Sequence, residues 1–513
     1  MMMMIRYYSD RLKARFRAGS ESRNAPISPP PMETHELLVP QPLTVVDPPE
    51  KSEHSLKDWP GFHGYIHDMD ARKMIQEIGD YIIRLEDDGD TTYIILNVGE
   101  EMKEDPFWET EPKEEVEEAA SEDGWVPIKV NTYVIEKDEA GFSIDGLNYF
   151  ESVDSLLSYY VFHSDKSSLD VKLLYNVPRK MFEFEPEDIQ KMTSLSSGRF
   201  FDVDLCKIDR PGLLEQIAAV KSVKLGLPNA SEQSQKLIEE GRLLLDLEHP
   251  NIIQILGWCL DEHPFKLVIQ FVPGGPLDMY LLTHFPVTSV KRLMRFAVEI
   301  AQGLEYLHCN RVIHRDIAAR NILLSSDGTP KISNFHLSLK SRFWRMKVAE
   351  KIPLRYVPPE VFALNIFSQK SDVYAFGVLL FEIFTGGSPP YEGLLSDDVK
   401  ACIMSNTLNQ FPEGTPPKLA KYVEENIWAF YFDERPMMDE IIDYLENLMA
   451  EMEKNGEYGP VTDAETDKVL KNYQPDIEKA SQQRSLLELD KDVLEELCPT
   501  QDETISKATQ DTD

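Results

Sequence analysis

The eight residues His-Arg-Asp-Ile-Ala-Ala-Arg-Asn, numbers 314–321, decide the interpretation of this chain. Asp316 carries a carboxylate that can accept the proton of an attacking hydroxyl group. Asn321 follows five residues later and offers an amide oxygen, a ligand that magnesium accepts. The apolar run Ile-Leu-Leu at 322–324 comes directly after it. A base and a metal ligand at this spacing suit chemistry on a metal-bound phosphate group.

Further short motifs lie before and after this stretch. They are Ala-Val-Lys at 219–221, His-Pro-Asn-Ile-Ile at 249–253, Gln-Phe-Val at 270–272, Pro-Pro-Glu at 358–360, Asp-Val-Tyr-Ala-Phe-Gly at 372–377 and Arg-Pro at 435–436. In this order they resemble the landmarks of the protein kinases, and residues 318–321 resemble the tyrosine-specific branch. The resemblance covers residues 183–450 and implies a bilobal kinase fold, with ATP and magnesium as cofactors and proteins as substrates.

The resemblance also implies a set of site residues. Lys221 would steady the α- and β-phosphates, Glu240 would be its carboxylate partner on the following helix, and Asp316 would be the base. The full set comprises the catalytic residues Asp316, Lys221, Glu240 and Arg320, the metal ligands Asn321 and Asn334, and the nucleotide-binding residues Gly198, Val203, Ala219, Lys221, Ile269, Gln270, Val272 and Leu323.

Two departures from the family pattern affect the expected activity. The family's Asp-Phe-Gly is Asn-Phe-His at 334–336, so a neutral amide replaces the carboxylate that should hold magnesium. The phosphate loop at 195–203 keeps Gly198 alone of three glycines, and side chains there obstruct the approach of backbone N–H groups to phosphate. We expect Phe201 to fill part of the phosphate space and the binding of ATP and magnesium to be weak or lost.

The activation segment carries one tyrosine between residues 334 and 360, Tyr356, at a position where the family usually has tryptophan. We therefore expect no ordinary activation tyrosine. Because Asp316 and the other catalytic residues are retained, an active non-receptor tyrosine kinase stays an alternative. We favour a pseudokinase.

Residues 57–165 alternate strand-like runs with short helical segments, which predicts an α+β module. Trp59, Phe-His-Gly at 62–64 and Tyr-Ile-Ile-Arg-Leu-Glu at 81–86 resemble a Src-homology-2 (SH2) domain. The resemblance implies a central antiparallel sheet with flanking helices. It also implies that Arg84 grips phosphotyrosine through two parallel charge-assisted hydrogen bonds, so that phosphotyrosine-containing proteins are partners.

Three residues depart from the pattern expected around that arginine. Asp68 and Glu86 replace residues that usually contact the phosphate, and Thr132 replaces the usual histidine of the fourth strand. Two acids near a phosphate dianion repel it. We expect phosphotyrosine binding of reduced affinity.

An SH2 domain followed closely by a kinase domain resembles the Fes/Fer group of cytoplasmic tyrosine kinases. The predicted organisation is a Pro/Ser-rich lead at 1–56, the SH2 domain at 57–165, a linker at 166–182, the kinase-like domain at 183–450 and an acidic tail at 451–513. Residues 100–124 hold twelve acids and two lysines, which predicts an exposed insertion in the first domain.

Two stretches have apolar residues at helical spacing, and they predict helices of different kinds. Leu293, Phe296, Ala297, Ile300, Leu304 and Leu307 predict a buried central helix. In the tail, residues 486–497 form an amphipathic stretch that either docks a partner or the kinase domain, or is a surface helix, and we favour the surface helix.

Composition narrows the class of protein. The formal net charge of −36 argues against nucleic-acid binding, which needs a basic surface. Five cysteines lie far apart without the density of a secreted disulfide scaffold, so a reducing compartment such as the cytoplasm is expected. No apolar run approaches the roughly 20 residues that cross a bilayer.

Overall fold

The structure, a computed structural model of the chain, describes residues 56–59, 61–87, 91–101, 128–162, 173–212, 214–347, 350–473 and 496–497. Residues 1–55 of the predicted lead and most of the acidic insertion lie outside these residues, as does most of the tail beyond 473. Two five-stranded sheets, one after the other along the chain, organise the described part.

The first sheet has the strand order β4-β3-β2-β1-β5 and is antiparallel except for the parallel pair of β1 and β5. Its strands are β1 Asp80–Asp87, β2 Thr92–Glu101, β3 Ile128–Asp138, β4 Gly141–Ser143 and β5 Tyr175–Asn176. The helices beside it are α2 Asp68–Met74 and α3 Val153–Phe162, with a 3-10 turn η1 at Leu56–Asp58. We call the described residues of 56–177 the N-terminal module.

The two faces of this sheet are covered by different helices because side chains of a strand alternate between faces. Ile83 of β1 packs with Leu156 and Tyr160 of α3. Its neighbour Ile82 packs with Ala71 of α2 on the other side. The strand runs predicted within residues 81–83 and 92–96 are confirmed.

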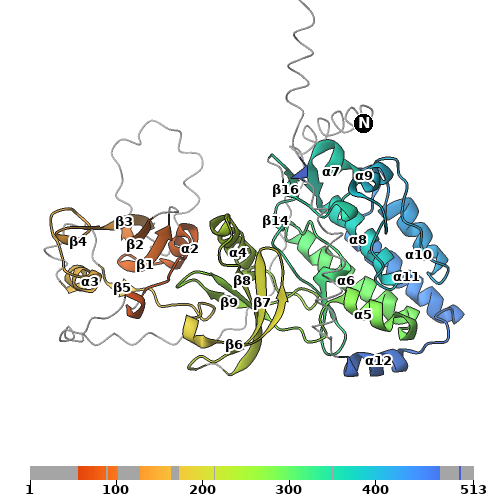
Figure 1. The fold of residues 1–513 in the computed structure, drawn as a ribbon, viewed down its shortest axis with the longest axis horizontal. Helices are drawn as coiled ribbons and strands as arrows, with labels where there is room; N and C mark the ends of the chain where they lie inside the picture. Colours follow the sequence, from red (N-terminus) through yellow and green to blue (C-terminus); the bar gives the residue numbers. More distant parts are fainter. Residues whose placement is uncertain are drawn as a thin grey trace, which may run out of the picture.

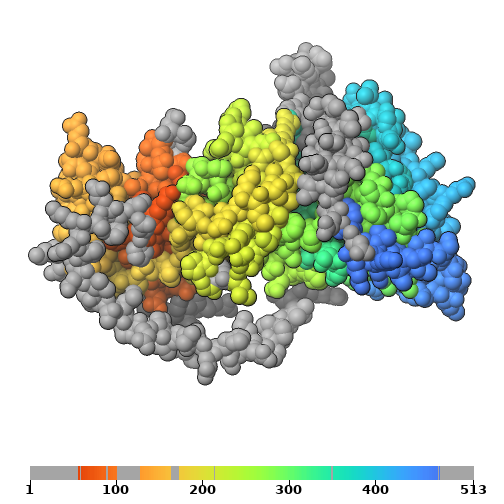
Figure 2. Space-filling view, turned by 60° about the horizontal axis from the view of Figure 1, so that its bottom comes forward, coloured from red at the N-terminus to blue at the C-terminus, as the bar shows by residue number. Residues whose placement is uncertain are grey.

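The second sheet, with the order β6-β7-β8-β10-β9, forms a smaller lobe with helix α4 Ala230–Leu245. Its antiparallel strands are β6 Ile189–Ser197, β7 Phe201–Ile208, β8 Gln216–Val223, β9 Ile255–Cys259 and β10 Lys266–Gln270. Figure 2 shows this lobe, yellow to light green, between the N-terminal module and a larger lobe made mostly of helices.

The larger lobe is built around α6 (Figure 1). Its helices are α5 Leu277–His284, α6 Val290–Cys309, α7 Pro359–Leu364, α8 Gln369–Phe384, α9 Ser396–Met404, α10 Pro417–Tyr422, α11 Met438–Asn455 and α12 Asp463–Asn472. All six residues of the predicted apolar stripe on α6 are buried, which confirms the central helix.

Short elements complete the larger lobe. Two-stranded sheets join β11 Val312–Ile313 to β14 Leu339–Lys340, β12 Ile322–Leu324 to β13 Pro330–Ile332, β15 Phe343–Arg345 to β17 Ile366–Ser368, and β16 Glu350–Lys351 to β18 Glu496–Leu497. The single turns of this lobe are η4 Phe285–Val287, η5 Ala319–Asn321, η6 Leu354–Tyr356, η7 Val423–Ile427 and η8 Phe432–Glu434, whereas η3 Pro186–Asp188 lies directly before β6 in the smaller lobe. Leu497, predicted at the end of a helix, is therefore in a strand, and residues 486–495 lie outside the described ones.

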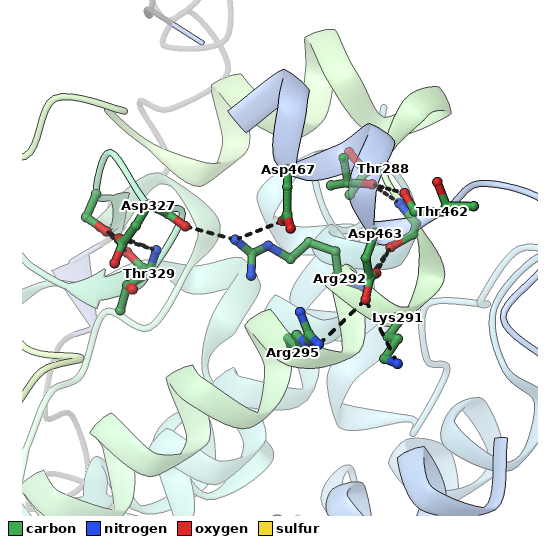
Figure 3. A network of polar contacts seen from close by, with 12 residues as sticks. Thr288, Lys291, Arg292, Arg295, Asp327, Thr329, Thr462, Asp463 and Asp467 are labelled. Carbon is green, nitrogen blue, oxygen red and sulfur yellow. Dashed lines mark hydrogen bonds and ion pairs between the residues drawn. The ribbon is translucent and has the colours of Figure 1, made fainter. Parts of the chain in front are cut away.

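Helix α12 packs against the start of α6, although its residues are mostly polar (Figure 3). The carboxylate of Asp463 accepts a hydrogen bond from the Ser289 hydroxyl at 2.7 Å, and Thr466 Oγ1 accepts the Ser289 backbone N–H at 2.9 Å. Leu470 is buried in the main core. In the described part of the chain, no helix is long and apolar enough to cross a membrane.

Candidate active site

A buried ion pair joins the second sheet to helix α4. Lys221 lies on β8 and Glu240 on α4, and their Nζ and Oε2 atoms are 2.7 Å apart. Both side chains are buried. The other oxygen of Glu240 accepts the backbone N–H of Phe335 at 3.2 Å, and the Phe335 side chain is buried beside His314. These contacts hold α4 against the sheet.

The loop that carries Asp316 is fixed from helix α8. The Asp372 carboxylate accepts the backbone N–H groups of His314 and Arg315 at 2.7 and 2.9 Å. Burial lowers the pKa of His314, so its ring is neutral. Nε2–H then donates to the Ser333 carbonyl at 3.1 Å, while Nδ1 accepts the Asp316 N–H at 3.3 Å.

Asp316 lies among three other predicted site residues. Arg320 forms an ion pair with its Oδ1 atom. The side-chain amide of Asn321 donates to its backbone carbonyl at 2.7 Å. On the other side, Nδ2 of Asn334 lies 3.4 Å from Asp316 Oδ2. The structure thus brings the candidate base and both candidate metal ligands together.

The side-chain amide of Asn334 directs its nitrogen, not its oxygen, toward Asp316 and Asn321. Because Asn321 uses its nitrogen on the Asp316 carbonyl, its oxygen faces Asn334 and accepts Nδ2–H at 3.1 Å. The Asn334 oxygen lies 2.9 Å from Nδ1 of His336, whose pKa burial and the nearby Lys221 charge keep well below the usual range. A neutral His336 therefore donates Nδ1–H to that oxygen.

This arrangement does not fit a magnesium ion. The amide oxygens of Asn321 and Asn334 both accept hydrogen bonds within the protein, and N–H groups lie between the would-be ligands. Hard cations need several converging oxygens, preferably charged. Among the described residues, no group of three or more His, Cys, Asp and Glu side chains could hold a metal.

The phosphate loop is a hairpin turn between β6 and β7. Gly198 N–H donates to the Phe201 carbonyl at 2.8 Å, and the Phe201 ring centroid lies 4.5 Å from Nζ of Lys221. An ammonium over an aromatic face is attracted to the ring. Phe201 therefore covers the ammonium group that was predicted to contact phosphates.

The other predicted nucleotide-binding residues lie along the same sheet and the segment after it. The register pairs Val203 with Lys221 and Ala219 with Ile269. Gln270 ends β10. Val272 is buried just beyond it, and Leu323 lies on β12.

Tyr356, in η6, is unsuited to phosphorylation in this arrangement. Its hydroxyl donates to Glu382 at 2.8 Å, and its ring lies 4.7 Å from the Arg320 guanidinium. Burial raises its pKa well above the usual range. The hydroxyl is therefore an internal hydrogen-bond donor.

A second candidate site lies in the N-terminal module around Arg84, which is 3% exposed. Its Nε donates to Asn97 at 2.9 Å, and its terminal nitrogens contact Glu86 at 2.6 Å and Asp68 at 3.3 Å. Thr132 accepts a hydrogen bond from Asn97 at 2.9 Å. The structure thus brings Asp68 and Glu86 to Arg84, and Thr132 to its neighbour Asn97.

A comparison with known protein families matches the smaller and larger lobes together. Residues 189–445, about half of the chain, match the protein tyrosine and serine/threonine kinase family. The chain belongs to this family.

Three relatives of the kinase domain show how far the likeness extends. Fer-related kinase 1 of Caenorhabditis elegans is 34% identical over 248 residues, 48% of this chain and 62% of that protein. Spermatocyte protein spe-8 of Caenorhabditis briggsae is 25% identical over 451 residues, 86% of this chain and 81% of that protein. Mouse tyrosine-protein kinase Fer is 27% identical over 389 residues, which are 75% of this chain and 43% of that protein. The chain therefore spans less than two thirds of Fer-related kinase 1 and of Fer.

Sequence reasoning missed two contacts of the kinase domain and one of the N-terminal module. The sequence pattern shows His336 only as the replacement of a glycine, whereas in the structure its ring donates a hydrogen bond to the Asn334 oxygen at 2.9 Å. Glu382 belongs to no motif of the sequence, although it accepts the backbone N–H of Ala319 beside the catalytic loop at 2.8 Å. Arg72, which contacts Asp68 at 2.5 Å, was also missed. In the sequence, only the spacing of Arg72, one helical turn after Asp68, indicates that the two side chains are in contact.

Proposed function

We propose that this chain is an SH2-containing signalling protein of the tyrosine kinase family that binds phosphotyrosine, with ATP-dependent phosphorylation of tyrosine impaired or absent. One observation supports the impaired phosphorylation. The Asn334 amide turns its N–H group toward Asp316 and Asn321, where a magnesium-binding kinase needs a carboxylate. With the Asn334 N–H in that place, the site lacks the charged ligand that would hold a magnesium ion against the phosphoryl group.

The position of Phe201 supports the same proposal. Its ring lies over the ammonium of Lys221, which pairs with Glu240 even without a nucleotide. An ion pair of this kind can brace helix α4 against the sheet and need not serve catalysis. The kinase domain would then act as a binding surface for other proteins.

An active tyrosine kinase is the second candidate, favoured by the closed pair of Lys221 and Glu240 at 2.7 Å and by the intact base Asp316. In this alternative, nucleotide binding would displace Phe201 and reorient Asn334. Its substrates would be protein tyrosines.

The phosphotyrosine part of the proposal rests on the N-terminal module. Its mostly antiparallel sheet with α2 and α3 on opposite faces supports the proposed SH2 domain at 57–165. The parallel strand β5 at Tyr175–Asn176 belongs to the same sheet, so the module extends into the stretch predicted as a linker, 166–182. Arg84 rises from the buried part of β1 toward Asn97 and Asp68. We further propose a cytoplasmic protein, in agreement with the free cysteines among the described residues.

Two measurements on the full chain separate the candidates. Thermal unfolding is followed with ATP, with and without magnesium, and phosphotransfer is measured on a tyrosine-containing polymer. We expect no magnesium-dependent shift and no turnover above that of Asp316→Asn. Robust turnover that Asp316→Asn abolishes would favour the active kinase and overturn the pseudokinase.

Asn334→Asp tests the metal argument directly. The new carboxylate would face the Asp316 carboxylate and the Asn321 oxygen, so we expect a lower melting temperature without a divalent cation and a gain on adding magnesium. Activity should not reach that of an ordinary kinase, because Phe201 still covers Lys221. Full activity from this single change would show that Phe201 is no obstacle.

A further inference from the structure

Arg72 and Arg84 hold the same carboxylate between them. Arg72 lies on α2, and its Nε contacts Asp68 Oδ2 at 2.5 Å. Arg84 lies on β1, and one of its terminal nitrogens contacts Asp68 Oδ1 at 3.3 Å. The amide of Asn97 also donates to Oδ1 at 3.3 Å. We call these two arginines, with Asn97, the two-arginine cluster.

The cluster is anchored independently of Asp68. The terminal nitrogens of Arg72 donate to the Val130 carbonyl at 2.8 Å and to Thr132 Oγ1 at 2.9 Å, both on β3. Arg84 Nε donates to Asn97 on β2 at 2.9 Å. Removing the Asp68 charge would therefore leave both guanidinium groups attached to the sheet, with donors available for another anion.

The acids lie on the accessible side of the cluster. The side chain of Arg84 is 3% exposed, whereas those of Asp68 and Glu86 are 34% and 56% exposed. Asp68 is ionised, because Arg72, Arg84 and Asn97 together hold its pKa below the usual range although partial burial opposes them. An ionised carboxylate of the protein itself, that of Asp68, therefore lies between Arg84 and the solvent.

We propose that Asp68 is an internal anion that occupies the phosphate position of this site, and that Arg72 and Arg84 together hold the phosphate monoester of phosphotyrosine once Asp68 has moved out. This inference rests on the proposed phosphotyrosine binding and adds two residues to it. Arg72 is the second phosphate ligand, and Asp68 sets the affinity by competing for both arginines. The Asp68 carboxylate also contacts both guanidinium groups, but a phosphate dianion carries more negative charge and a third acceptor oxygen, so both arginines gain when it replaces the carboxylate.

The test titrates the full chain with a phosphotyrosine peptide and, in parallel, its unphosphorylated form. Asp68→Asn keeps the shape of the side chain and removes the charge, and we expect it to tighten phosphopeptide binding about tenfold, equivalent to about 1.4 kcal/mol. The matched control is Asp87→Asn. Asp87 ends the same strand as Arg84 but contacts Thr92 and His263, so this change should leave the affinity unaltered.

A second substitution isolates Arg72. In the Asp68→Asn background, Arg72→Gln should remove the gain in affinity while the melting temperature shows that the module remains folded. If Asp68→Asn does not fold, Glu86→Gln replaces it. That variant removes the other acid at Arg84, 2.6 Å away, and should also tighten binding.

The outcomes separate this inference from the proposed function. Ordinary binding by the unmodified chain that Asp68→Asn does not change would overturn the inference and leave phosphotyrosine binding standing. Binding that appears only in Asp68→Asn and needs Arg72 would support the inference and overturn phosphotyrosine binding as an activity of the native chain. No binding by any folded variant would overturn both. A gain that survives Arg72→Gln would overturn the assignment of Arg72.

Discussion

At the scale of single residues, Glu382 on α8 is a buried carboxyl group next to the catalytic loop. Its two oxygens accept the Ala319 N–H and the Tyr356 hydroxyl, each at 2.8 Å. Burial raises its pKa to about 7, although these hydrogen bonds and the charge of Arg320 lower it, and Asp278 adds to the rise. Ionisation of Glu382 near neutral pH therefore disfavours the folded state.

The sign of the pH dependence follows from this shift. Between the ordinary pKa of 4.5 and the folded value of about 7, the folded protein keeps a proton that the unfolded chain has released. The free energy of unfolding should therefore fall as pH rises through this window, by up to about 3 kcal/mol. Glu382→Gln should flatten the curve in denaturant titrations from pH 5 to 8. The exposed Glu239→Gln is the control, and parallel curves for Glu382→Gln and the unmodified chain would contradict the assignment.

Motif spacing predicted which residues meet at the candidate active site but not how their side chains are turned. Residue identity shows that Asn334 is neutral. The direction of its amide depends on Asn321, thirteen positions earlier, and on His336, whose hydrogen bonds exist only once the loops of the larger lobe have folded together. Arg72 on helix α2 was missed for a similar reason, since its partner Thr132 lies on β3, beyond the acidic insertion.

At the scale of elements, periodicity predicted the helices and strands that bury a regular apolar stripe. Helix α6 does so, and its whole stripe is in the core. Helix α12 does not, because hydrogen bonds and ion pairs hold most of its contact face, and Leu470 is one of its few apolar residues. Composition therefore placed residues 463–472 in the acidic tail. The helix also lies beyond residue 445, where the match to the kinase family ends.

Leu470 tests whether α12 is an integral part of the larger lobe. Its side chain is 6% exposed and packs in the main core, so Leu470→Ala should lower the free energy of unfolding by about 2–5 kcal/mol. Lys471→Ala, one position later and exposed, should change it by less than about 0.5 kcal/mol. Equal unfolding midpoints in denaturant for the two variants would show that the helix adds nothing to the stability of the lobe.

At the scale of the whole molecule, the N-terminal module docks against the smaller lobe. Asp70 on α2 receives two nitrogens of Arg242 on α4, at 3.0 and 2.7 Å. Just beyond the module, in the predicted linker, Arg179 forms a bidentate pair with the buried Asp261 of the smaller lobe at 3.0 and 2.9 Å. Sequence patterns do not predict such contacts, because each joins surfaces whose residues look like ordinary solvated charges.

Each of the two helices at this interface carries a residue of one candidate site. Helix α2 places Asp68 against Arg84 and, two positions later, Asp70 against Arg242. Helix α4 carries Arg242 two positions after Glu240, the partner of Lys221. We therefore expect the pair of Asp70 and Arg242 to stabilise the folded chain as a unit.

A double-mutant cycle measures this pair. The side chains of Arg242 and Asp70 are 23% and 13% exposed, so Asp70→Asn, Arg242→Gln and the double variant should give a coupling energy of about 0.5–3 kcal/mol in thermal or denaturant unfolding. The exposed pair of Lys57 and Glu262, 47% and 50% exposed, crosses the same interface and should couple by less than about 1 kcal/mol. Strictly additive effects of Asp70→Asn and Arg242→Gln would mean that the two groups do not interact in solution, and α2 and α4 would then be neighbours without being linked.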